Sequence, residues 1–202
     1  MSIKENPLEH SKVPAPAVKE APTTAPTTAT ATAPIVGRTL AVLRIATGLV
    51  FAWAFVDKTF GLGYATPSAN AWLNGGSPTN GFLGHLDHGP LASTFQSWAG
   101  AWWADWLFML GLAGIGLALL AGIGLRIAAI SGTIMMLLMW AAEWPLDRLT
   151  DTGEPTMSTN PILDYHIIYA LILITLAATA AGNTWGLGRT WAHTTRDNHW
   201  LR

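Results

Sequence analysis

Four long apolar runs dominate the pattern of hydrophobic and polar positions along the chain. Each is close to the roughly 20 residues that an α-helix needs to cross about 30 Å of hydrocarbon at 1.5 Å per residue. The runs cover about residues 38–58, 103–123, 125–144 and 161–182. Short connections favour antiparallel neighbours. The pattern therefore predicts an all-α integral membrane protein, built as a four-helix up-and-down bundle with a long outer loop between its first two helices.

The polar stretches between the runs differ in length. Gly124-Leu125-Arg126 alone separates the second run from the third, which predicts a tight hairpin. Residues 59–102 form the one long connection, and within it a surface helix over about 90–102 is predicted. Its apolar positions recur at steps of four, three and four: Leu91, Phe95, Trp98 and Trp102. We expect this outer loop to act as a passive connector or as a lid.

The two ends of the chain are expected to lie outside the bundle. Residues 1–37 are rich in Pro, Ala and Thr, a composition that cannot bury enough apolar area to fold, so they predict a disordered tail. Residues 183–202 form a second tail. Most basic residues fall on the side of the two tails, which places both termini in the cytoplasm and the chain in the cell membrane as a multi-pass protein. They are Lys19, Arg38, Arg126, Arg189 and Arg196, against Lys58 and Arg148 on the other side.

Composition narrows the classes of function. Half of the 202 residues are hydrophobic and 11% are charged, against roughly 25% charged in a soluble domain. The net charge is -1 and the sequence has no basic patch, so it does not indicate a surface that binds nucleic acid. The absence of cysteine excludes disulfides, iron–sulfur ligation, attached c-type haem and thiol chemistry. With one histidine in a predicted span and no Glu-x-x-His motif, we expect neither a bis-histidine haem nor a bound metal.

Small residues and acidic residues each form a pattern along the helices. Gly114, Ala118 and Gly122 recur every four residues, which predicts a flat stripe for close helix packing. Each predicted helix also carries one carboxylate at the outer boundary, so the four are expected to form one layer: Asp57, Asp105, Glu143 and Asp164.

The helix dipole separates these carboxylates into two kinds. Asp105 and Asp164 lie in first turns, where the dipole favours negative charge, and Asn160-Pro161 is typical of an N-cap followed by the first helical residue. Asp57 and Glu143 lie at helix C-termini, where the dipole disfavours them. They are therefore the stronger functional candidates.

Three further polar residues bear on function. His166 is two residues from Asp164, which would place the two side chains on roughly opposite faces of a helix. Arg44 lies six residues beyond Arg38, about 9 Å deeper along a helix. Its side chain is expected either to extend back to the headgroups or to point inward, toward helix carbonyls, a lipid phosphate or a quinone oxygen. Lys58 ends the first run.

Two segments resemble a known family. Arg44-Ile-Ala-Thr-Gly48-Leu-Val-Phe51-Ala-Trp53-Ala-Phe-Val-Asp57-Lys58 resembles the first-helix signature of the DoxX/DoxD-like membrane proteins. Gly116 to Ala129 resembles their second-to-third helix hairpin, and the long outer loop and the entry to the last run are similar to the DoxD-like branch. The resemblance covers about residues 38–182. It implies the large subunit of a thiosulfate:quinone oxidoreductase that works with a small extracytoplasmic redox subunit.

The resulting hypothesis is a quinone-linked oxidoreductase subunit in which four residues accept or donate protons. These residues are Asp57, Glu143, Asp164 and His166, while Arg44 or Lys58 would polarise a quinone oxygen. Because thiosulfate is a dianion and the outer layer is acidic, either burial protonates some carboxylates or a partner binds the anion. Two alternatives stay open: a non-enzymatic scaffold or anchor for a partner protein, and a small-solute permease. The expected partners are the lipid bilayer, the small redox subunit and a second copy of the chain.

Overall fold

The structure is a computed structural model that describes residues 28–196 and residue 198. Within these residues the fold is all-α, with seven helices and no strand. The helices are α1 (Thr28–Phe60), α2 (Asn80–Leu83), α3 (Ala92–Trp98), α4 (Trp102–Ala121), α5 (Leu125–Glu143), α6 (Tyr165–Ala178) and α7 (Gly188–Thr194). Three short 3-10 turns join them, at Ser68–Asn70, Trp72–Asn74 and Ala181–Asn183.

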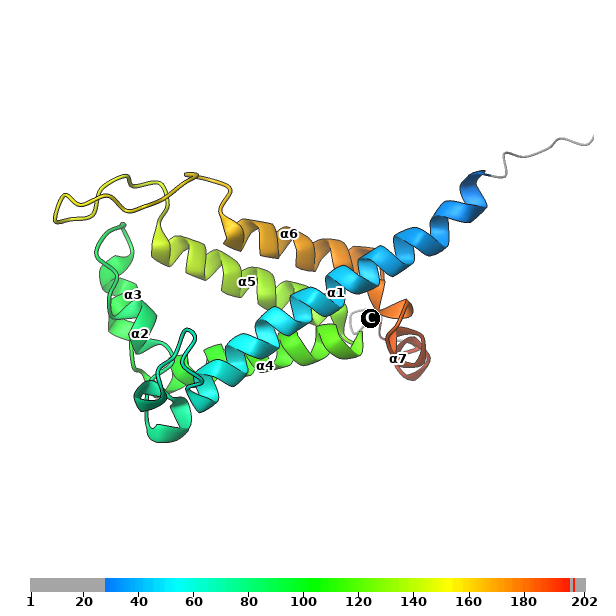
Figure 1. Ribbon diagram of the computed structural model, residues 1–202, viewed down its shortest axis with the longest axis horizontal. Helices are drawn as coiled ribbons and strands as arrows, with labels where there is room; N and C mark the ends of the chain where they lie inside the picture. The colour runs from blue at the N-terminus through cyan, green and yellow to red at the C-terminus, as the bar shows by residue number, and fades with distance from the viewer. Residues whose placement is uncertain (1–27, 197, 199–202) are drawn as a thin grey trace, which may run out of the picture.

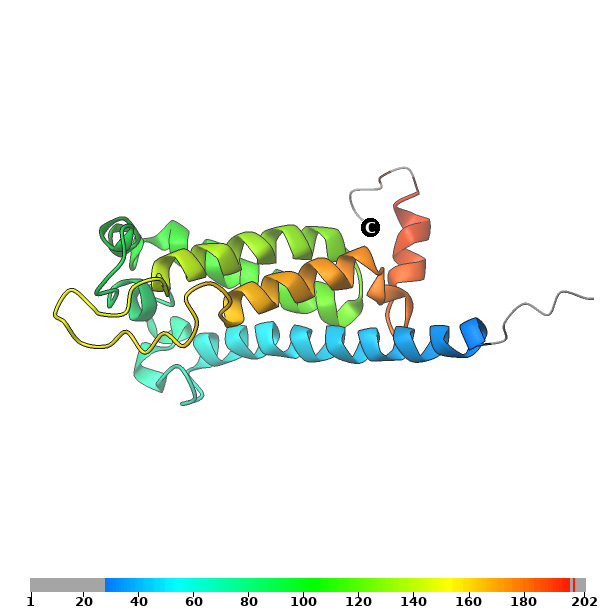
Figure 2. The same ribbon diagram turned by 90° about the horizontal axis from the view of Figure 1, so that it is seen from above.

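Four helices run side by side along the long axis of the molecule (Figure 1), each antiparallel to the next along the chain: α1, α4, α5 and α6. Helix α1 packs mainly on α4, and α5 on α6, while α4 and α5 join the two pairs. The pairs diverge at one end, where residues 61–101 and 144–164 lie; we call this the loop end. They converge at the termini end, which holds the start of α1 and residues 179–196. Seen from above, α7 stands across the bundle axis (Figure 2).

In the part of the chain that the structure describes, three helices are long and apolar enough to cross a membrane, which is the mark of a multi-pass membrane protein. They are Pro34–Phe60 within α1, Trp102–Ala121 and Leu125–Glu143. The fourth predicted run, 161–182, forms a shorter helix than expected, because α6 covers only Tyr165–Ala178. Asp164 caps its start, and Ala180 adopts a left-handed conformation just past its end. At 1.5 Å per residue its 14 residues span about 21 Å.

Both predicted tails contain helix. Residues 28–37, expected to be disordered, belong to α1, which runs through Pro34. A proline inside a helix removes one backbone hydrogen bond without ending an Ala-rich helix that a long apolar segment continues. At the other end, Gly188–Thr194 of the predicted tail 183–202 forms α7. The disorder predicted for residues 1–27 lies outside the described residues, as do 197 and 199–202.

The surface helix predicted over about 90–102 is present but shorter, as α3 (Ala92–Trp98). Gly100 ends it with a positive φ of 75°, and Trp102 already belongs to α4. Of the predicted apolar face, Phe95 is buried and packs edge-on against Trp98, with ring centroids 5.2 Å apart.

Close packing between α1 and α4 depends on small residues other than those predicted. A Cβ on Gly116 would lie 2.8 Å from the backbone nitrogen of Ala52, so the two helix backbones nearly touch there. Gly48 of α1 faces Leu119 and Leu120 in the same way. Gly114, which the four-residue spacing had placed in the packing stripe, is exposed and has nothing within 4 Å of its Cβ position. The prediction was wrong for Gly114, because a single spacing does not tell which side of an apolar helix faces a neighbour. Gly122 of the same stripe is buried, and a Cβ there would lie 3.0 Å from the Cα of Gly182.

Candidate functional site

The loop end of the α5–α6 pair brings together three ionisable side chains from two helices. Glu143 is the last residue of α5, which stops there because Trp144 adopts a left-handed conformation with φ 41° and Pro145 follows. Asp164 is the N-cap of α6, and His166 lies in the first turn of that helix. The loop 144–164 returns the chain, so that the start of α6 lies beside the end of α5 (Figure 1).

Asp164 both caps the helix and holds the imidazole of His166. Its Oδ1 accepts the backbone N–H groups of His166 (3.0 Å) and Ile167 (3.2 Å), which satisfies two of the free donors of a helix start. Its Oδ2 lies 2.8 Å from His166 Nδ1. A carboxylate that already accepts backbone hydrogen bonds is an acceptor here too, so Nδ1 carries the hydrogen.

This pairing corrects the expectation that Asp164 and His166 lie on opposite faces. The face rule applies to residues inside a helix, whereas Asp164 has extended backbone angles (φ -91°, ψ -175°) and lies just outside it. The helix start was also misplaced. Asn160 does not cap α6; its side-chain oxygen instead accepts the N–H groups of Ile162 and Leu163, both at 3.0 Å, within the loop.

Glu143 lies between the Asp164–His166 pair and the protein surface. Its Oε2 lies 3.8 Å from His166 Nδ1, and its Oε1 accepts a hydrogen bond of 2.8 Å from the hydroxyl of Tyr165. The side chain of Glu143 is 34% exposed, while that of His166 is completely buried. Tyr165 was not predicted as part of the site; its only signal was its place between Asp164 and His166, and its ring lies 4.0 Å from that of His166.

The second nitrogen of His166 faces the interior. Nε2 is buried and has no hydrogen-bond partner among the described residues. His166 continues the buried stripe of α6, with Ala170 and Leu173 four and seven residues further on. With the hydrogen on Nδ1, Nε2 presents a lone pair. The arrangement thus places a base in an apolar interior, with its other nitrogen held by a carboxylate.

The same three residues could hold a metal ion, which the sequence did not predict. One ligand atom each from Glu143, Asp164 and His166 lies within 4.8 Å of the other two. Carboxylate oxygens and an imidazole nitrogen suit Zn²⁺, Mn²⁺ or Fe²⁺. An ion there would replace the hydrogen on Nδ1, so it would compete with the hydrogen bond to Asp164.

Asp57 and Lys58 lie at the loop end but on the other helix pair. The Asp57 carboxylate is 2% exposed and accepts the N–H groups of Tyr64 (3.4 Å) and Ala65 (3.0 Å), which fold back over the end of α1. Lys58 Nζ lies 5.8 Å from the centroid of the Phe108 ring. The contacts described for these two side chains do not include Glu143, Asp164 or His166.

Asp105 fixes the outer loop to the start of α4. One carboxylate oxygen accepts the Ser77 hydroxyl (2.9 Å), the Thr79 N–H (2.9 Å) and the Thr79 hydroxyl (2.6 Å). The four carboxylates predicted to form one layer are therefore all at the loop end, but they divide by task. Asp57 and Asp105 hold loop backbone, while Glu143 and Asp164 surround a histidine.

A second histidine fastens the outer loop to the site. His88 Nε2 lies 2.8 Å from the carbonyl oxygen of Glu143, and His88 Nδ1 lies 2.7 Å from Asp87 Oδ1. The next residue, Gly89, packs so close to Trp144 that a Cβ would lie 2.7 Å from the Cβ of that tryptophan. In the sequence, the adjacent Asp-His pair was the one signal that could have indicated this contact. The outer loop therefore covers the end of α5.

Arg44 belongs to a separate cluster at the termini end. Its side chain is fully buried; Nη1 donates to the carbonyls of Leu119 and Leu120 at the end of α4. Nη2 donates to the carbonyls of Thr184 (3.3 Å) and Trp185 (2.8 Å) in the turn after α6. Of the two alternatives for Arg44, the side chain points inward and binds helix carbonyls.

Comparison of the chain with models of known protein families, with curated proteins and with solved structures gives no match.

Proposed function

We propose that the protein is a membrane subunit of a quinone-linked oxidoreductase, which binds the quinone ring at His166 and moves protons through the His166–Asp164 pair. The observation that supports it is the buried Nε2 of His166, which lacks a hydrogen-bond partner among the described residues. A buried polar atom of this kind is rare and commonly marks a ligand or a catalytic role. A quinone is apolar, and both of its redox forms fit this atom: a hydroxyl of the hydroquinone donates to the lone pair of Nε2, and an oxygen of the quinone accepts from Nε2 when both ring nitrogens carry a proton.

The pair of nitrogens gives His166 the means to move a proton. An imidazole accepts a proton at one nitrogen and releases one at the other. Asp164 and Glu143 lie 2.8 Å and 3.8 Å from Nδ1, so two carboxylate acceptors are at hand for the proton that Nδ1 releases when both ring nitrogens carry one. In that state Nε2 becomes a donor toward the interior. Glu143 is 34% exposed and links Nδ1 to water at the loop end.

A bound quinone would supply two-electron redox chemistry, taking up two electrons and two protons to give a hydroquinone. In the reaction that the family resemblance suggests, two thiosulfate ions give one tetrathionate and these two electrons. The loop end of this chain is a poor site for such a dianion, because the eight acidic side chains of the described residues gather there. We therefore assign thiosulfate binding to a small extracytoplasmic subunit and quinone binding to this chain.

The membrane arrangement in this proposal has four crossings. Helix α6, with its flanking residues, is the fourth, and both termini are cytoplasmic. Two observations support this orientation. The start of α1 and the end of α6 lie at the same end of the bundle (Figure 1). That end also carries arginines on α1, α5 and α7, and basic residues favour the cytoplasmic side. The loop end is then extracytoplasmic, where a partner subunit can reach it.

The test is quinone reduction by the full chain purified with whatever co-isolates. Thiosulfate-dependent reduction of a short-chain quinone is compared between the natural chain, His166→Gln and His85→Gln. Gln keeps a hydrogen bond but cannot carry a proton, so His166→Gln should lose about 10²–10⁴-fold in turnover. His85 is exposed at the loop end and serves as the matched control. Equal turnover in His166→Gln and the natural chain would overturn the proposed role.

Two further measurements distinguish quinone binding from a metal site and from a scaffold. Turnover that vanishes with a chelator and returns with one divalent metal would assign the Glu143–Asp164–His166 cluster to a metal ion instead. A chain that retains its partner but neither holds quinone on extraction nor reduces it would be a scaffold. The quinone content is measured by mass spectrometry of a solvent extract from the same sample.

A further inference from the structure

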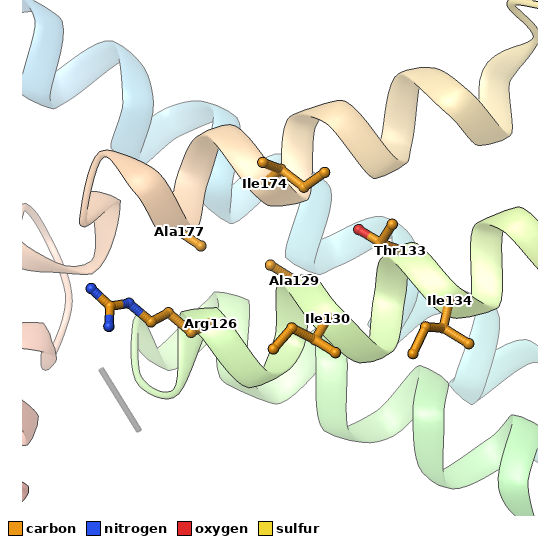
Figure 3. A pocket seen from close by; sticks show the side chains of 7 residues that line it. All are labelled: Arg126, Ala129, Ile130, Thr133, Ile134, Ile174 and Ala177. Carbon is orange, nitrogen blue, oxygen red and sulfur yellow. The ribbon is translucent and has the colours of Figure 1, made fainter. Parts of the chain in front are cut away.

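An apolar groove at the termini end of the α5–α6 pair has no part in the proposed function. It measures about 490 Å³, within the roughly 300–1,000 Å³ of small-molecule sites. Figure 3 shows Arg126 beyond one end of the groove. Its walls are Ala129, Ile130, Thr133 and Ile134 of α5 and Ile174 and Ala177 of α6.

The walls face the hydrocarbon around the helices. Ile130, Ile134 and Ile174 are 52%, 54% and 47% exposed, so an occupant enters sideways from the surroundings of the bundle. The hydroxyl oxygen of Thr133 is buried in the wall and has no hydrogen-bond partner among the described residues. In a membrane, a groove of this kind suits an acyl chain, and its polar lining groups are the Thr133 hydroxyl and the guanidinium of Arg126.

The termini end is strongly basic. A second hollow, of about 560 Å³, is lined by Asn183, Arg189, Ala192, His193 and Arg196 on and beside α7. The two hollows belong to one region, because α7 is fastened to the turn that precedes α5. The N–H of Leu187 donates to the carbonyl of Ala121 (2.9 Å), and a Cβ on Gly182 would lie 2.1 Å from the Gly122 carbonyl oxygen.

No acidic side chain of the described residues lies at this end. The eight that are described are all at the loop end: Asp57, Asp87, Asp105, Glu143, Asp147, Asp151, Glu154 and Asp164. An apolar slot beside a surface that carries Arg126, Arg189 and Arg196 is complementary to a molecule with a hydrocarbon chain and an anionic head. Basic pockets beside membrane helices bind the headgroups of anionic lipids through the same combination of apolar contact and charge attraction.

We propose that the termini end binds one anionic phospholipid, with an acyl chain in the groove and its phosphate among Arg126 of α5, Arg189 of α7 and Arg196, which follows α7. The groove accounts for the chain, which a free phosphate lacks, and the arginines account for the net charge, which a zwitterionic lipid lacks. The site shares no residue with the His166 cluster, so it stands whether or not a quinone binds there.

Native mass spectrometry of the full chain in detergent tests the proposal, with phosphatidylglycerol and phosphatidylcholine of the same acyl chains as probes. We expect phosphatidylglycerol to bind tighter. At about fivefold for each arginine, Arg189→Gln combined with Arg196→Gln should reduce that preference about 25-fold. The matched control is Arg148→Gln at the loop end, which should leave the preference unchanged. Equal binding of the two lipids, or equal loss in the control, would overturn the proposal.

The groove is tested separately by filling it. Ala177→Leu places a larger side chain in the groove and should weaken phosphatidylglycerol binding, while Ala178→Leu on the exposed neighbouring position should not. Thr133→Val, which keeps the volume, checks that a folded chain still binds when only the hydroxyl is lost. If Ala177→Leu folds and binds as the natural chain does, or if inorganic phosphate displaces the lipid completely, the acyl chain is not in the groove and the proposal fails.

Discussion

His166 and Asp164 are joined side chain to side chain across a single intervening residue, with Nδ1 2.8 Å from Oδ2. The same carboxylate accepts the backbone N–H of His166 through its other oxygen. One aspartate therefore starts helix α6, fixes the orientation of the imidazole and sets which nitrogen carries the hydrogen. His166 is thus held by Asp164 at both its backbone and its ring, although it lies in the first turn of a helix.

Substitutions at Asp164 should separate these tasks. Asn is as good an N-cap as Asp, so Asp164→Asn should keep the thermal stability of the chain. It removes the negative charge beside Nδ1 and should lower quinone reduction at least tenfold. Asp164→Ala should lower turnover as well and also cost about 1 kcal/mol of stability. Thermal unfolding and turnover are measured on the same samples; full turnover in Asp164→Asn would show that the charge does not matter.

Arg44 should prove essential for stability rather than for chemistry. Arg44→Gln removes donors from four carbonyl groups at the junction of α4 and the turn after α6. Each buried group left without a partner costs about 1–3 kcal/mol, so the variant should unfold well below the natural chain. Arg38→Gln changes an exposed arginine on the same helix and should leave the melting temperature nearly unchanged. Similar melting temperatures for the two variants would contradict the assigned role.

Two glycines of α4 should respond in opposite directions to the same substitution. Gly116→Ala places a Cβ 2.8 Å from the Ala52 nitrogen and should destabilise the α1–α4 pair by about 1–3 kcal/mol. Gly114→Ala meets open space and should stabilise the helix by about 0.5–1 kcal/mol. Thermal unfolding in one detergent compares them. The packing described for α1 and α4 would be wrong if both substitutions shifted the melting temperature the same way.

Asp105 should control the order of the outer loop. Asp105→Ala leaves the N–H and hydroxyl of Thr79 without their acceptor, at a cost of about 1–3 kcal/mol, so residues 61–101 should be cut faster by chymotrypsin. Asp151→Ala is the control, since Asp151 is an exposed acidic residue of the other loop. Cleavage sites are identified by mass spectrometry. Equal rates in the two variants would show that Asp105 does not hold the loop.

The long elements of the fold could be predicted because hydrophobic length alone determines them. The runs 103–123 and 125–144 correspond to α4 and α5 within two residues at each end. The end of α6 could not be predicted in this way, because Thr179 to Ala181 are as compatible with a helix as the residues before them. What ends the helix is the left-handed Ala180 and the turn that Arg44 holds from a distant helix, and no local pattern encodes that contact.

The site was predicted only in outline, for a similar reason. Position at a helix C-terminus favoured Glu143 and Asp57, Asp164 was a candidate as a carboxylate of the outer layer, and His166 was a candidate as the one histidine in a predicted span; Glu143, Asp164 and His166 do come together. These signals could not separate them from Asp57, because the fold-back of Tyr64 and Ala65 onto that carboxylate depends on how the outer loop closes. The pairing of Asp164 with His166 was missed because it requires knowing the helix start to within one residue.

The central claim, that His166 Nε2 accepts a hydrogen bond from a hydroxyl of the bound hydroquinone, is tested most directly by hydroquinone binding, which needs no partner subunit. The measurement is an anaerobic titration of the purified chain in lipid nanodiscs with a short-chain hydroquinone, followed by quenching of tryptophan fluorescence. The account predicts saturable binding that weakens about three- to tenfold in His166→Phe, the range of one lost hydrogen bond, and stays unchanged in His85→Gln. Saturable binding of equal strength in His166→Phe and the natural chain, or no saturable binding at all, would contradict it.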